Sequence, residues 1–109
     1  MVVPLDSKVV SALTAAAPDL LPTTIRPERY KHLGAPVSTV GRPVVLITSE
    51  DIDAEVVYRL VKVVFDGMER FKRIHPALRR LEPESMLRDG LATPLHEGAR
   101  KYVLESGLM

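Results

Sequence analysis

The chain has 109 residues, of which 46% are hydrophobic and 5% aromatic, as in one small globular domain rather than a disordered chain. The formal net charge of +1 gives no indication of a nucleic-acid partner, and the lack of cysteine excludes disulfides, thiol nucleophiles and cysteine-based zinc sites. No uninterrupted apolar run approaches the roughly 18 residues of a membrane-spanning helix.

The N-terminal part predicts a short strand, a helix and an irregular crossing segment. Val2–Leu5 is a brief apolar run, and Asp6 or Ser7 is placed to cap the helix that follows. Pro18 ends this helix because proline removes a backbone N–H and restricts the residue before it. The proline-rich stretch after it favours an extended crossing, with β character at Thr23–Ile25.

The segment 37–50 holds the best strand candidate. Val44–Ile47 form a continuous apolar run, which is typical of a strand buried on both faces. Gly41 and Pro43 would interrupt a long central strand, so a bend is expected there.

The strongest helix is predicted between residues 50 and 75, where His75-Pro76 ends it. Acidic residues at its start and basic residues at its end agree with the helix dipole. Val56 and Val63 widen its apolar stripe, so we expect the helix to be covered on more than one side. The stripe itself consists of Val57, Leu60, Val61, Val64, Met68 and Phe71.

The C-terminal part predicts a short helical piece, a turn at Pro83 and a loop at Asp89-Gly90. The last helix is expected from Glu97 to Glu105, with Gly107 placed to end it. Together these elements predict an α/β fold, or α+β for a standalone chain, as a single domain over residues 1–109. Its small sheet is expected to have about three strands covered by helices.

The three histidines do not form a metal-binding pattern, because His32, His75 and His96 lie far apart with no ligand spacing around them. His75 is interpreted as the end of a helix before proline. His96 is interpreted as a helix N-cap, with Glu97 in the first turn; Thr93 is a rival cap one turn earlier. A catalytic or metal-binding His96 is the alternative.

Signals for an enzyme are weak. No serine lies in a GxSxG context, and no glycine-rich phosphate-binding loop is present. The acidic pairs Glu50-Asp51 and Asp51/Asp53 could act as acid and base, but at a helix start such residues more often serve as caps. We therefore expect no enzymatic activity, no cofactor and no metal.

Two polar segments are candidates for binding. The proline-fixed segment "TTIRPERY", residues 23–30, carries hydroxyl and guanidinium groups suited to a small carboxylate; the alternative is a solvent-facing connection. A basic cluster around His75 could dock an acidic partner, although interspersed glutamates favour a solvated helix end. This cluster consists of Arg70, Lys72, Arg73, Arg79 and Arg80.

Four segments, in the same order and over nearly the whole chain, resemble the C-terminal portion of TAXI-type solute receptors, the extracytoplasmic subunits of certain TRAP transporters. They are "PDLLPTTIRPERY", "VSTVGRPVVLITSEDID", "EVVYRLVKVVFDGMERFKRIHPAL" and "PLHEGARKYVLESGL". The chain departs from the family at Glu97 and at Arg26, where the family usually has proline.

The resemblance implies part of a lobe of the periplasmic-binding-protein type II kind, taken from a longer, two-lobed protein. The implied ligand is a small organic acid or amino acid such as a dicarboxylate or glutamate. Thr24 and Tyr30 are the expected contacts, with Thr39 behind them. The implied partner is the TRAP membrane permease.

The resemblance also implies a periplasmic location. The N-terminus lacks the pattern of a signal peptide, so the chain is expected in the cytoplasm if expressed as it stands. The alternative to a receptor is a truncated remnant or interaction module, which would self-associate as a homodimer and bind no solute.

Overall fold

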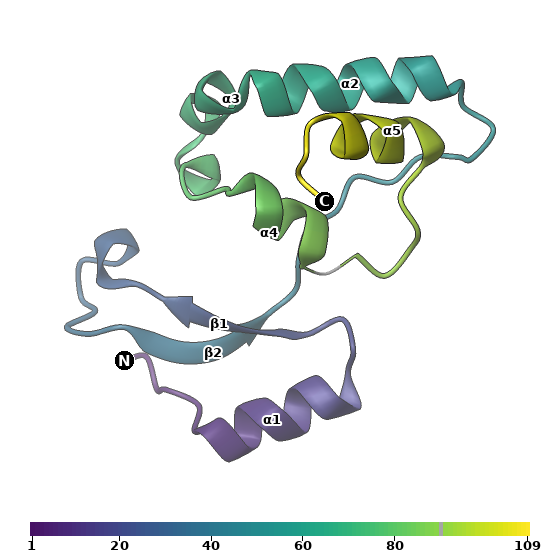
Figure 1. Ribbon diagram of the computed structural model, residues 1–109. Coiled ribbons are helices and arrows are strands. Elements are labelled where there is room, and N and C mark those ends of the chain that lie inside the picture. Colours follow the sequence, from purple (N-terminus) through teal and green to yellow (C-terminus); the bar gives the residue numbers. More distant parts are fainter. Residues whose placement is uncertain (90) are drawn as a thin grey trace. The chain divides into compact units, whose positions relative to one another are not determined.

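The computed structural model describes residues 1–89 and 91–109 (Figure 1). The chain divides into two compact units, Met1–Val45 and Leu46–Met109. The predicted α/β class, with mixed helices and a small sheet, is confirmed. Gly90 of the predicted loop lies outside the described residues. The single domain remains a prediction.

The first unit contains helix α1 (Ser7–Ala16). Asp6 is its N-cap, because the Asp6 carboxylate accepts a hydrogen bond from the Val9 amide at 2.9 Å. The helix ends two residues before Pro18, as predicted. It contacts both strands of the sheet.

The sheet of the first unit has two antiparallel strands, β1 (Leu21–Ile25) and β2 (Val37–Gly41), with the short helix η1 (Pro27–Arg29) in the connection between them. Val37 is the buried hydrophobic side chain among those that the structure describes in this unit. The β character predicted near residue 24 is confirmed. The paired residues are Leu21 with Gly41, Pro22 with Val40, Thr23 with Thr39, Thr24 with Ser38, and Ile25 with Val37.

The predicted strand Val2–Leu5 is wrong, so the sheet of the described residues has two strands instead of about three. The strand predicted in the segment 37–50 is present, but it lies at Val37–Gly41 and not at Val44–Ile47. Among the described residues, Val2–Leu5 forms one backbone hydrogen bond to the sheet, from the Leu5 amide to the Ser38 carbonyl at 3.0 Å. Val44–Ile47 is not a strand, and its four side chains are 45% to 100% exposed. An apolar run becomes a buried strand only beside a partner strand, and no described residue provides one.

The second unit begins with two consecutive helices where one was predicted: α2 (Ala54–Asp66) and α3 (Met68–Ile74). The break falls at Gly67, consistent with the low helix propensity of glycine. The start of α2 agrees with the acidic cluster, because the Asp53 carboxylate accepts a hydrogen bond from the Glu55 amide at 2.7 Å.

The predicted last helix is confirmed as α5 (Glu97–Glu105). Gly107 follows it with a positive φ of 69°, a conformation that glycine adopts without steric penalty. The Gly107 amide donates to the Leu104 carbonyl at 3.4 Å, and the Leu108 amide donates to the Val103 carbonyl at 3.2 Å. This pair of bonds is a Schellman C-cap, which explains why the helix ends there.

The core of the second unit lies where α5 packs against α2 (Figure 1). Two shorter elements, η2 (Pro76–Leu78) and α4 (Pro83–Arg88), lie between these helices in the sequence. Among the described residues, none of the helices has the length and apolarity needed to cross a lipid bilayer. The buried side chains of this unit are Val57, Met68, Tyr102 and Val103.

A second apolar stripe on α2 is exposed. Val56, Leu60 and Val63 recur at helical spacing, and each is at least half exposed. The prediction that α2 is covered on more than one side is therefore wrong for the described residues. A single partner helix covers only one side of α2, and α5 occupies the side of Val57.

Candidate functional site

The two threonines expected to contact a ligand lie on opposite faces of the sheet. Thr39 is paired with Thr23, whereas Thr24 is paired with Ser38. Opposed residues share a face and successive residues alternate, so Thr24 and Thr39 point to opposite sides. Thr24 is exposed and Thr39 is partly buried. A ligand lying on one face can therefore contact only one of them.

Tyr30, the third expected ligand contact, lies on an exposed turn directly after η1. Its amide donates to the Pro27 carbonyl at 3.0 Å, and its own carbonyl accepts from the Leu33 amide at 2.9 Å. The backbone of Tyr30 is thus fixed by two hydrogen bonds while its ring faces solvent. Its role in binding remains a prediction.

His96 and Glu97 form the start of α5. The Nδ1 atom of His96 accepts a hydrogen bond from the Gly98 amide at 3.1 Å, and Glu97 is the first helical residue. Because Nδ1 is the acceptor, the proton of the neutral ring lies on Nε2. The Nε2 atom is buried and has no partner among the described residues. The ring therefore serves the helix start, and no carboxylate of the described residues pairs with it.

Gly98 lets α5 approach α2 closely. A Cβ atom built at Gly98 would collide with the Ala54 carbonyl oxygen and would lie 2.7 Å from the Tyr58 amide nitrogen. Such distances are too short for a side-chain carbon, so only glycine fits between the two backbones. The cap at His96 therefore places the first turn of α5 directly against the first turns of α2.

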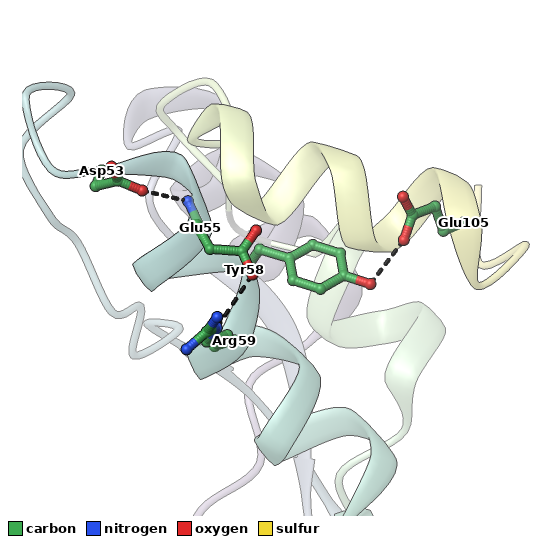
Figure 2. A network of polar contacts seen from close by, with 5 residues as sticks. All are labelled: Asp53, Glu55, Tyr58, Arg59 and Glu105. Carbon is green, nitrogen blue, oxygen red and sulfur yellow. Dashed lines mark hydrogen bonds and ion pairs between the residues drawn. The ribbon is translucent and has the colours of Figure 1, made fainter.

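Two tyrosine hydroxyl groups join α2 and α5 reciprocally. Tyr58 on α2 donates to Glu105 on α5 at 2.7 Å, as Figure 2 shows, and Tyr102 on α5 donates to Asp66 on α2 at 2.7 Å. The two rings meet edge to face, with centroids 5.9 Å apart. Each helix thus contributes one phenol and one carboxylate to the interface.

Charged side chains surround this interface. Lys62 forms an ion pair with Asp66 at 2.7 Å, and on the same helix Arg59 pairs with Glu55 at 3.1 Å (Figure 2). Lys101 lies over the Tyr58 ring, 5.0 Å from its centroid. These groups are partly or largely exposed, so each ion pair contributes little to stability.

Burial, hydrogen bonds and charges shift the pKa values of the tyrosines and of Asp66 at this interface. Burial, followed by the hydrogen bond to Asp66, raises the pKa of Tyr102 to about 12. The hydrogen bond to Glu105 is the main cause that raises the pKa of Tyr58. Lys62, and then Tyr102, lower the pKa of Asp66. At neutral pH the phenols are therefore protonated donors and Asp66 is an ionised acceptor, which suits a structural contact.

The described residues contain no cluster of three or more histidine, cysteine, aspartate or glutamate side chains that could hold a metal ion. His75 is the N-cap of η2, where its Nδ1 atom accepts from the Ala77 amide at 3.1 Å. His75 and His96 thus use the same ring nitrogen for the same structural purpose.

The tyrosine contacts between α2 and α5 were not predicted from the sequence. The available signal was a tyrosine in each of the two longest predicted helical segments of the C-terminal part, Tyr58 and Tyr102. A phenol placed on the packed side of a helix needs a polar partner, which predicts a hydrogen bond without identifying the acceptor.

In a comparison with known protein families, the model of the NMT1-like family matches residues 1–107. This match covers nearly all of the 109 residues and includes both compact units. No curated protein matches the chain.

Proposed function

Because the chain belongs to the NMT1-like family, whose relatives are solute receptors of the periplasmic-binding-protein type II kind, we propose that it acts as a solute-receptor-like protein. The observation that carries this proposal is the extent of the family match, which runs over residues 1–107. The proposed ligand is a small organic acid or amino acid.

Within this class, the proposed specialisation is that of a TAXI-type receptor serving a TRAP membrane permease in the periplasm. The resemblance of four ordered segments supports it, including "PLHEGA" at the start of α5. In this segment His96 caps the helix and Gly98 provides the close contact with α2. The glutamate at position 97 occupies the first helical position, where proline is also favoured, so the departure from the family pattern is compatible with the same helix start.

The proposal includes no enzymatic activity and no cofactor. It is supported by the structural contacts that four polar side chains form. His75 and His96 cap helices, and Tyr58 and Tyr102 hold α2 and α5 together.

The proposed ligand contacts are Thr24 and Tyr30, with Thr39 behind them. The strand register sharpens this proposal, because Thr24 lies on the exposed side of β1 and Thr39 lies on the other side of the sheet. Thr24 is thus the threonine available to a ligand on the exposed face, and Tyr30 supplies a hydroxyl from the turn.

Isothermal titration calorimetry tests the proposal with glutamate, 2-oxoglutarate and C4-dicarboxylates. At least one should release or absorb heat and raise the melting temperature, because a ligand that binds only the folded state stabilises it. Thr24→Val should weaken that binding, whereas Thr23→Val, on the same strand but the opposite face, should not. If none of these ligands gives a heat signal or a thermal shift, solute binding by this chain is refuted.

A second candidate function is a self-associating interaction module that binds no solute. The exposed apolar residues of Val44–Ile47 and the exposed stripe Val56, Leu60 and Val63 favour it, because apolar surface of this kind is usually covered by a partner. Sedimentation analysis separates the two candidates: the module should dimerise with rising concentration, and a concentration-independent monomer contradicts it.

A further inference from the structure

The junction of α3 and η2 contains an open hollow of about 500 Å³. Its lining is strongly basic: three cationic side chains and one carboxylate, namely Lys72, Arg73, Arg79 and Glu69. Lys72, Arg73 and Arg79 belong to the basic cluster identified in the sequence. This hollow lies wholly within the second unit and contains none of the proposed ligand contacts.

Lys72 forms the fixed part of the hollow. Its side chain is only 17% exposed, and its Nζ atom lies 3.5 Å from a Glu82 carboxylate oxygen and 3.9 Å from a Glu69 carboxylate oxygen. Two carboxylates therefore offset the charge of Lys72. The contact with Glu82 also ties α3 to the segment that precedes α4.

Unlike Lys72, the two arginines that line the hollow are exposed and lack ion pairs with the described residues. Arg73 and Arg79 form no ion pair with the described residues, and both are exposed. Each guanidinium group is a planar fork of donors that matches a carboxylate in a bidentate geometry. The hollow thus presents two guanidinium groups without ion pairs, next to a lysine whose charge is offset by two carboxylates.

We propose that this hollow is a docking surface for an acidic segment of a partner protein. Charge complementarity carries the proposal: two carboxylates of such a segment would pair with Arg73 and Arg79. A small free anion fits less well, because small-molecule sites enclose about 70–90% of their ligand, whereas this hollow is open to solvent.

The proposal is independent of solute binding and is tested on the whole chain. The probe is a fluorescein-labelled decaglutamate peptide, and the measurement is fluorescence anisotropy. The wild-type chain should bind the peptide in low salt and bind more weakly at about 0.15 M salt, where screening acts over about 8 Å. In NMR spectra, the amide signals that shift on binding should lie mainly in residues 69–79.

Variants assign the binding to the two guanidinium groups. Arg73→Gln/Arg79→Gln should weaken peptide binding at least about tenfold, as expected for the loss of two charge-assisted contacts. The control Lys8→Gln/Arg100→Gln removes the same charge from two exposed residues elsewhere and should change binding less than about twofold. Arg73→Lys/Arg79→Lys keeps the positive charge but loses the bidentate guanidinium geometry, so this variant should bind the peptide with intermediate affinity.

Three results would overturn the proposal. The first is that the wild-type chain does not bind the peptide at low salt. The second is that the glutamine variant and its charge-matched control weaken binding equally, which would indicate net charge alone. The third is that inorganic phosphate or succinate binds the hollow as tightly as the peptide, which would make it a small-anion site. Circular dichroism melts of all three variants separate loss of folding from loss of binding.

Discussion

Replacing Tyr102 by phenylalanine tests whether the hydroxyl contacts hold α2 and α5 together. The change removes only the hydroxyl group that donates to Asp66 at 2.7 Å, and the ring can stay in its packed position. A hydrogen bond to a charged group contributes about 1.5–3 kcal/mol, but Asp66 is half exposed and keeps Lys62 as its partner. We therefore expect a loss of about 1 kcal/mol in the free energy of unfolding.

Thermal and urea denaturation measure this loss, which corresponds to a fall in melting temperature of about 4–8 °C for a unit of this size. The matched control is Tyr30→Phe, because Tyr30 is exposed and its hydroxyl forms no hydrogen bond with the described residues. This control should melt within about 1 °C of the wild type, as surface substitutions usually do. Equal melting temperatures for all three proteins would refute the assigned role of the hydroxyl group.

The pH dependence gives a second measurement on the same variant. The pKa of Tyr102 is raised from 10.0 to about 12, so the folded state favours the protonated phenol. Its contribution to stability is therefore complete below pH 10 and is lost as the pH rises through the folded value near 12. Tyr102→Phe should lack this part of the alkaline loss. An identical fall in stability between pH 10 and 12 in variant and wild type would contradict the assignment.

Two other predictions concern the start of α5. Gly98→Ala should lower the free energy of unfolding by about 1–3 kcal/mol in urea denaturation, because the added Cβ collides with the Ala54 carbonyl oxygen. Gly34→Ala, with no atom within 4 Å of the added carbon, is the control, and equal losses would contradict the close approach. His96→Ala should cost about 1 kcal/mol through loss of the cap, and His96→Asn should restore most of it; a variant with Ala as stable as the wild type would exclude a cap contribution.

The start and end of α5 could be predicted because both depend on local chemistry. His96 accepts from an amide two residues ahead, and Gly107 supplies the positive φ that closes the last turn. Such signals lie within a few residues of the feature that they determine. The same holds for Asp6 and Asp53, whose carboxylates cap α1 and α2.

The ligand contacts illustrate what local patterns leave open. The hydroxyl groups of Thr24 and Thr39 can be identified from the sequence, but the faces on which they lie depend on the register of β1 against β2. Shifting that register by one residue would turn one strand over and bring the two threonines to the same face. The long connection between the two strands provides no tight turn that would fix the register locally, so the arrangement of the candidate site requires the structure.

The errors at Val44–Ile47 and at the second stripe of α2 have a common cause. In both places apolar patterning was taken as evidence of burial, but burial also requires a partner that supplies the other surface. The patterning itself is real: Val56, Leu60 and Val63 are spaced as a helix spaces one face, and four consecutive aliphatic residues suit a strand covered on both sides. The described residues leave these two surfaces without cover. Both the receptor and the self-associating module require another surface to bury these residues, and in the module a second copy of the chain provides that surface.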